Sequence, residues 1–228
     1  MLEDVHLDEA AVRRRQQQNL TAPRPDTRGV APSIRSFPQA IDRQRQSVEH
    51  VPVLLPTRPG LVEIARALDE AEVAALAVSL EDAGAELPLF STVARAVSVP
   101  ILRCDLLLEE FQVYESRAAG ADAVLLHAKL LGGAQLDRLC GAARATHMAA
   151  CVACETAEDV ARAAAARAAL IALARAEEAL FAAVPPRILV LAIGPTAAVR
   201  GRVDAVLDES IGSAADPAAA FRGTLAGE

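Results

Sequence analysis

The sequence predicts an α/β protein in which eight short strands alternate with helices. Apolar segments of strand length recur along the chain from about residue 51. Between them lie helical stretches whose apolar positions are three and four residues apart, such as Leu61, Ile64 and Leu68. Apolar residues make up 53% of the chain, but only 3% is aromatic, so the core must be built from Ala, Val and Leu. Small branched residues of this kind suit a closely packed strand and helix core.

The expected strands are short and regularly spaced. They cover residues 51–55, 73–78, 99–102, 123–126, 149–152, 170–173, 188–191 and 203–207. Strands that alternate with helices of this length favour right-handed βαβ units and a parallel sheet. Eight such units in about 175 residues fit a closed (β/α)8 barrel better than an open sheet, although spacing alone does not exclude a doubly wound sheet.

Residues 1–33 differ in composition from the rest of the chain. This segment is polar, and its basic and glutamine-rich run at 13–18 precedes a stretch containing proline at 22–32. We expect an N-terminal helical extension and linker over residues 1–33, followed by one barrel domain over residues 34–228.

Composition excludes several classes of protein. The net charge of −7 argues against general binding to nucleic acid. No apolar run approaches the roughly 18 residues that a membrane span needs, and the start of the chain does not read as a secretory signal. We therefore expect a cytoplasmic protein whose four cysteines are reduced thiols.

Lysine is almost absent from this chain. Of the 23 basic residues, all are arginines except Lys129. An arginine guanidinium stays protonated, whereas the pKa of a lysine ammonium can be tuned until the group gives up its proton. Any mechanism that requires two lysines is therefore excluded.

The segment 95–126 carries a resemblance to a known family. It reads ILRCD at 101–105 and YESRAAGAD at 114–122. It resembles indole-3-glycerol phosphate synthases, in which the third strand ends LRKDF and the next helix reads YEARAAGAD. Weaker echoes occur at 35–37, 55–58, 203–207 and 215–217, so the resemblance covers residues 34–226 in order. It implies a (β/α)8 TIM barrel.

The resemblance also implies catalytic residues that this sequence lacks. The family carries Glu and Lys on strand one, Lys on strand three, Glu on strand five, Asn on strand six and a Ser and Glu pair on strand seven. Strand one, residues 51–55, has no ionisable group, and the other matching positions are Cys104, Ala153, Ala174, Leu191 and Ala192. The family's ring closure, with loss of carbon dioxide and water, needs a lysine acid and carboxylates. We therefore expect a catalytically inactive barrel without a cofactor, acting as a scaffold, regulator or partner-binding protein.

The phosphate site implied by the resemblance is also altered. Such barrels hold phosphate on backbone amides of the loops after strands seven and eight. Gly194 is kept after strand seven, but Asp208 and Glu209 stand after strand eight, with an acid where the family has glycine. Because a carboxylate repels phosphate, we expect weak phosphate binding or none.

Two other functions stay open at this point. A ligand-binding barrel would use Arg103, Asp105, Arg175 or Gly194, each near a strand end, although an ordinary rim ion pair explains Arg103 and Asp105 more simply. An altered enzyme, a lyase of changed chemistry, would use groups on neighbouring strands, considered next.

Cys104, His127 and Cys154 fall at the ends of strands three, four and five, where a thiol–imidazole pair or a zinc site is sterically conceivable. The pair Cys151 and Cys154 is a weak signal, because residues three apart on a strand point to opposite faces. Buried cysteines and single histidines at strand ends are most often structural. We therefore expect no metal site here.

A barrel that keeps its fold but lacks the family's catalytic residues is expected to act through contacts outside the catalytic site. We expect a protein partner or a homo-oligomer, bound through the outer surface. The candidate surfaces are the alanine-rich helix at 157–168 and the N-terminal segment 2–20, which is not needed to close the barrel.

Overall fold

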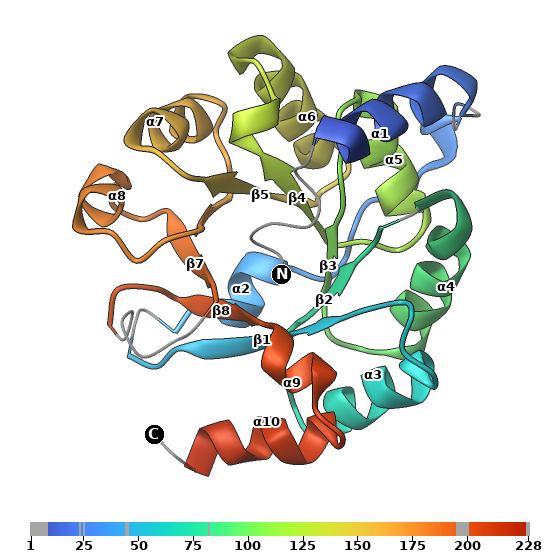
Figure 1. Ribbon diagram of the computed structural model, residues 1–228, viewed down its shortest axis with the longest axis vertical. Helices are drawn as coiled ribbons and strands as arrows, with labels where there is room; N and C mark the ends of the chain where they lie inside the picture. The colour runs from blue at the N-terminus through green and yellow to red at the C-terminus, as the bar shows by residue number, and fades with distance from the viewer. Residues whose placement is uncertain are drawn as a thin grey trace.

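The computed structural model is a closed barrel of eight parallel strands, seen end-on in Figure 1. The structure describes residues 9–22, 24, 26–43, 46–81, 83–194 and 201–226. The strands are β1 (Glu49–Leu54), β2 (Leu76–Ser79), β3 (Ile101–Cys104), β4 (Ala123–His127), β5 (Ala149–Cys154), β6 (Leu170–Leu173), β7 (Leu189–Ile193) and β8 (Ala205–Asp208). Each strand pairs with the next in sequence, and β8 pairs with β1. The predicted barrel and its eight strands are confirmed, and the open sheet is excluded.

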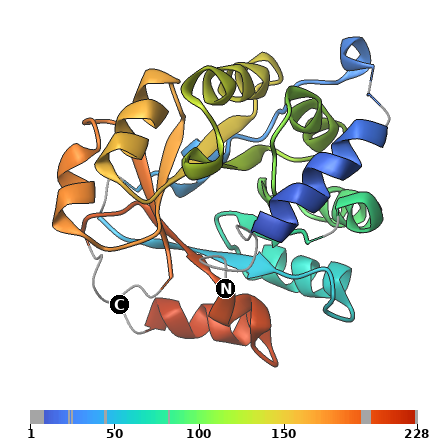
Figure 2. The same cartoon turned by 45° about the horizontal axis from the view of Figure 1, so that its top comes forward.

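Helices surround the barrel, as Figures 1 and 2 show. The longer ones that follow a strand are α3 (Leu61–Glu70), α4 (Ala83–Ala96), α5 (Glu110–Ala118), α6 (Gly133–Ala145), α7 (Ala157–Ala165), α8 (Glu178–Ala183) and α10 (Pro217–Ala226). Short elements are η1 (Thr27–Gly29), η2 (Ala128–Leu130) and α9 (Glu209–Ser213). Local capping explains where some of them begin: Thr156 and Asp159 form a reciprocal capping box at the start of α7. No helix of the described residues is long and apolar enough to cross a membrane.

Side chains alternate between the barrel interior and the helix layer along every strand. The interior packs small and branched residues, among them Val53, Ala77, Leu102, Leu125, Cys151, Ala172, Leu191 and Leu207. The opposite faces pack against the helices through residues such as Val78, Val124, Val152, Ile171, Val190 and Val206. The core therefore contains the small and branched residues that the composition predicts.

The N-terminal end of the barrel is plugged by the short helix α2 (Phe37–Ile41), which Figure 1 shows near the barrel axis. Phe37 and Ile41 are fully buried among interior side chains of the strands. Ser36 caps this helix by accepting a hydrogen bond from the Gln39 amide. Arg35 holds the preceding turn by donating to the carbonyls of residues 94, 97 and 120 and by pairing with Asp122 at 2.7 Å.

The N-terminal extension forms helix α1 (Glu9–Thr21), which is longer than the run at 13–18 that predicts it. This helix buries polar side chains, Arg15 and Asn19, rather than an apolar stripe. Asn19 donates to Gln112 Oε1 on α5 at 3.3 Å. Arg15 also pairs with Asp105 at 2.6 Å, so polar contacts help to hold α1 on the barrel.

Candidate functional site

Active sites of this fold lie at the carboxyl ends of the strands, so the inward-facing side chains there define the candidate site. In this chain they are Val53, Ser79, Cys104, His127, Ala153, Ile193 and Leu207, assigned by alternation from the interior residues before them. All are at most 9% exposed. Three polar ones, Ser79, Cys104 and His127, come from the neighbouring strands β2, β3 and β4. Those from β1, β5, β7 and β8 are aliphatic.

The positions matched to the family's catalytic residues do not all face this mouth. Cys104 and Ala153 pack in the interior cluster, and Ala174 is half-buried directly after β6. Ala192 instead packs in the helix-facing cluster. The inward-facing residues of β7 are Leu191 and Ile193, so of the two adjacent matched positions only Leu191 faces the interior, and both inward residues are apolar.

The candidate thiol and metal residues are only partly brought together. Cys104 lies in the barrel interior, whereas Cys154 packs on the helix side, where its thiol donates to the Val152 carbonyl at 3.5 Å. His127 follows the interior residues of β4. Among the described residues, no group of three or more His, Cys, Asp or Glu side chains could hold a metal ion.

The four cysteines are free and buried. Burial raises the pKa of the Cys104 thiol far above its usual value, and the charges of Asp105 and Glu209 add to the effect. Burial also raises the pKa of Cys154 to about 12, with Asp159 contributing. Because the thiolate is the reactive form, these environments disfavour nucleophilic chemistry at both residues.

The expected ion pair between Arg103 and Asp105 is present at the end of β3, and both side chains are buried. Arg103 is fully buried and donates to Asp105 Oδ2 at 2.6 Å and to Ser116 Oγ at 3.0 Å. From helix α1, Arg15 Nη2 donates to the other carboxylate oxygen of Asp105 at 2.6 Å. Both ligand candidates are thus engaged in a structural network.

Sequence reasoning did not identify Arg15 as part of this network. Arg15 is 90 residues away from Asp105 in the chain, and no local pattern links the two. The available signal was the spacing of Arg15 and Asn19 by four residues on a polar helix, which places both on one face.

Replacing Arg15 by methionine should loosen helix α1 while leaving the barrel folded. The substitution removes a buried charge-assisted hydrogen bond but leaves Asp105 paired with Arg103, so we expect a loss of about 2 kcal/mol in the free energy of unfolding. Hydrogen exchange should rise across residues 9–21. Arg14→Met is the matched control, because Arg14 is exposed on the same helix. Equal exchange in the two variants would contradict the assignment.

The remaining candidates lie at the surface or at the limit of the described residues. Arg175 is exposed and 3.6 Å from Glu177. Lys129 pairs with Glu155 at 3.1 Å, also in an exposed position. Gly194 follows β7 with a φ of 106°, a value that favours glycine. The loop that follows it, residues 195–200, lies outside the described part of the chain.

Asp208 caps the short helix α9 at the position where such barrels hold phosphate. Its Oδ1 accepts hydrogen bonds from the backbone amides of Ser210 and Ile211 at 2.9 and 3.3 Å, and Oδ2 lies 2.9 Å from His50 Nδ1. Burial alone would raise the pKa of Asp208, but the hydrogen bonds from His50, Ser210 and Ile211 outweigh it and lower the pKa to about 2. The carboxylate is therefore ionised at neutral pH and occupies amides that a phosphate would need.

The segment that most resembles the known family has structural roles in this barrel. Asp122 accepts the Ile101 amide at 3.0 Å and a hydrogen bond from Ser33 at 2.6 Å, and it pairs with Arg117 at 2.9 Å. Gly120 has a φ of 107°, and a Cβ there would lie 2.8 Å from the Ala94 Cβ. Conformation and packing thus require glycine and aspartate at this turn.

The chain is similar to known proteins in both sequence and fold. The profile of the indole-3-glycerol phosphate synthase family matches residues 5–175. A protein named indole-3-glycerol phosphate synthase from Neisseria meningitidis serogroup B is 36% identical over 144 residues, covering 60% of this chain and 55% of that protein. One of the same name from Arthrobacter sp. is 34% identical over 144 residues, covering 57% and 52%. The chain spans about half the length of the curated relatives it matches.

Two solved structures show the same fold at 16% sequence identity. Orotidine 5'-phosphate decarboxylase from Pyrococcus horikoshii has a TM-score of 0.62 over 75% of this chain and 95% of that chain. Thiamine phosphate pyrophosphorylase from Pyrococcus furiosus has a TM-score of 0.60 over 78% and 94%. The protein is thus a (β/α)8 TIM barrel. Within this class, the chain belongs to the indole-3-glycerol phosphate synthase family.

Proposed function

We propose that this chain is a non-catalytic member of its family and acts by binding a partner protein or a second copy of itself. The observation that carries the proposal is the aliphatic character of the barrel mouth on β1, β5, β7 and β8. There Val53, Ala153, Ile193 and Leu207 offer no group that transfers a proton or stabilises a charge.

The ionisable groups that remain near the strand ends support the same proposal. Asp105 is held between two guanidiniums, and the single ammonium, Lys129, is paired with Glu155 at an exposed position. The Cys104 thiol is kept protonated by burial. The family's chemistry needs a lysine acid working with carboxylates, and no such pair faces the mouth among the described residues.

Two surfaces of the barrel are candidates for the partner contact. Helix α7 buries Val160 and Ala163 against the barrel and exposes Ala157, Ala161 and Ala165, whose small side chains permit close helix packing. In α1, Leu20 is 75% exposed although it is a large apolar residue. A specific interface on these surfaces would bury on the order of 1,200 to 2,000 Å² in total.

Two measurements test the proposal: sedimentation and affinity capture from native extract. Both compare the full chain with a variant that lacks residues 1–33. We expect a defined oligomer or a stoichiometric partner that is weakened by the deletion or by Ala161→Arg on α7. Ala165→Ser, a small change on the same exposed face, is the control. A strict monomer that retains no partner and is unaffected by the deletion would refute the association.

We also propose that the usual phosphate site of the fold binds phosphate weakly or not at all. The Asp208 carboxylate accepts the Ser210 and Ile211 amides, so phosphate would have to displace it and tolerate its charge. Calorimetric titration with inorganic phosphate should detect no binding at millimolar concentration. Asp208→Gly, which frees the amides at little cost to the helix, should raise the affinity. Millimolar or tighter binding to the unmodified chain at this loop would contradict the proposal.

A further inference from the structure

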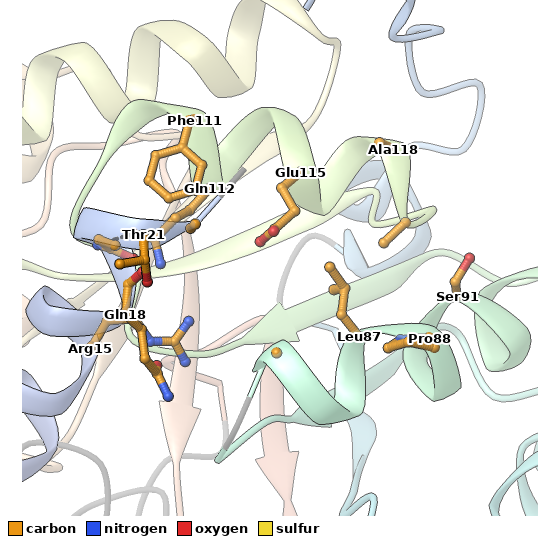
Figure 3. A pocket seen from close by; sticks show the side chains of 14 residues that line it. Arg15, Gln18, Thr21, Leu87, Pro88, Ser91, Phe111, Gln112, Glu115 and Ala118 are labelled. Carbon is orange, nitrogen blue, oxygen red and sulfur yellow. Dashed lines mark hydrogen bonds between the residues drawn. The ribbon is translucent and has the colours of Figure 1, made fainter. Parts of the chain in front are cut away.

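A groove of about 630 Å³ lies on the outer surface between α4 and α5, and α1 lines one end of it. Figure 3 shows the residues of the three helices around this space. The consecutive pairs α3–α4, α5–α6, α6–α7 and α7–α8 pack directly, whereas α4 and α5 make few contacts. The groove is the consequence of this separation. Its volume is typical of small-molecule sites, which span about 300 to 1,000 Å³.

The groove combines apolar side chains from α4 and α5 with uncharged polar ones, such as Gln18 and Asn19 from α1, and Glu115 is the one carboxylate among the described residues that line it. Leu87 and Pro88 from α4 lie opposite Ala118 from α5, whereas Phe111 lies nearer to Thr21 of α1. Glu115 projects from α5 into the space between the two helices, as Figure 3 shows. A carboxylate beside apolar side chains favours a ligand that combines a positive charge with an apolar body.

The negative charge of Glu115 is only partly compensated by the neighbouring charged groups. Arg15, Asp105, Arg103 and Glu115 form a row of alternating charges that runs from α1 to α5. Glu115 ends this row. Its Oε2 lies 3.4 Å from Arg103 Nη1, while Arg103 already binds Asp105 at 2.6 Å. A cation beside the outer oxygen of Glu115 would continue the alternation.

Two further groups bear on this groove. Arg24 lies over the Phe111 ring at 3.8 Å and pairs with Glu109 at 3.0 Å, so its own charge is compensated. At the α1 end, the buried Arg15 Nε–H has no hydrogen-bond partner among the described residues.

We propose that this groove binds a small amphiphilic amine. The ammonium donates to Glu115, and the apolar body packs between Leu87 and Pro88 on α4 and Ala118 on α5. The site rejects carboxylates, since Glu115 would repel them. The groove shares α1 with one proposed partner surface, but its test measures binding of a small molecule to the full chain, so failure of this proposal is distinguishable from failure of the partner contact.

Three probes of the same shape test the charge preference: phenylpropylammonium, phenylpropanol and phenylpropanoate, titrated into the full chain by calorimetry. We expect the ammonium to bind at least about tenfold more tightly than the other two, because a charge-assisted hydrogen bond is made only in its complex. Equal affinities, or no binding of the ammonium at millimolar concentration, would overturn the proposal.

Substitutions at the groove test whether the ammonium probe binds there. Glu115→Gln should reduce the affinity for the ammonium to that for the alcohol, whereas Glu110→Gln, an exposed position on the same helix, should leave it unchanged. Ala118→Lys keeps Glu115 and places a competing ammonium one helical turn away, so it should abolish binding of the probe. This variant provides a second test of the site in case Glu115→Gln destabilises the fold. Unchanged binding in a folded Ala118→Lys or Glu115→Gln variant would exclude this groove.

Discussion

A tryptophan auxotroph that lacks indole-3-glycerol phosphate synthase is expected not to grow when it expresses this chain. The family's reaction needs several proton-transfer groups, and each typically contributes a factor on the order of 10² to 10⁴ in rate. The mouth presents Val53, Ala153 and Ile193 instead, and its thiol, Cys104, is protonated. The proposed absence of these groups should bring turnover to the uncatalysed background.

Complementation and a direct assay together measure this prediction. The purified chain is incubated with carboxyphenylamino-deoxyribulose phosphate, the family's usual substrate, and product is followed with time. The Neisseria meningitidis relative serves as the positive control, with expression of both proteins checked by immunoblot. Growth of the auxotroph, or turnover by the pure chain, would refute the proposed loss of catalysis.

Gly212→Ala is expected to lower the free energy of unfolding by about 3 kcal/mol or more, because overpacking against rigid backbone can exceed the usual range. Gly212 lies in α9, which packs directly on β1. A Cβ at this position would overlap the carbonyl oxygen of Val53 and lie 2.7 Å from its carbonyl carbon. Arg58 also donates to the Gly212 carbonyl at 2.6 Å, so a shift of α9 would strain a second contact.

Thermal and urea unfolding measure this effect, which should lower Tm by roughly 6 to 12 °C for a domain of this size. Gly141→Ala is the matched control. Gly141 lies within helix α6, and a Cβ there meets only the end of the Arg144 side chain at 3.8 Å. This control should be neutral or slightly stabilising, because alanine favours helix. Equal stability of the two variants would show that α9 does not approach β1 as described.

Some features of the barrel could be predicted from the sequence because they depend on local patterns. Side chains alternate along a strand, so apolar segments such as 123–126 and 170–173 were recognisable as strands in a buried sheet. The same rule predicted that Cys151 and Cys154 point to opposite sides of the barrel wall. The resemblance at 95–126 then identified the closed topology, which spacing alone left open.

The candidate site was only partly predictable. Cys104 and Ala153 pack in the barrel interior, whereas Ala192 packs against the helices, because neighbouring residues of a strand point to opposite faces. Asp208 and Glu209 were expected to place negative charge where a phosphate would sit. In the structure Asp208 also caps α9 through the nearby Ser210 and Ile211 amides, and its contact with His50 depends on how β8 pairs with β1.

The sequence by itself determined which segments are strands, which family the chain resembles and that a mechanism with two lysines is excluded, since these follow from composition and local order. Only the tertiary structure decided that Arg15 reaches Asp105, that α2 plugs the barrel and that α4 and α5 separate around Glu115. Each of these features depends on the relative positions of elements that are not adjacent in the chain or do not contact each other directly. They depend on the register of the strands and on the docking of helices around the closed barrel, and neither can be recognised from the periodicity of apolar residues in the sequence.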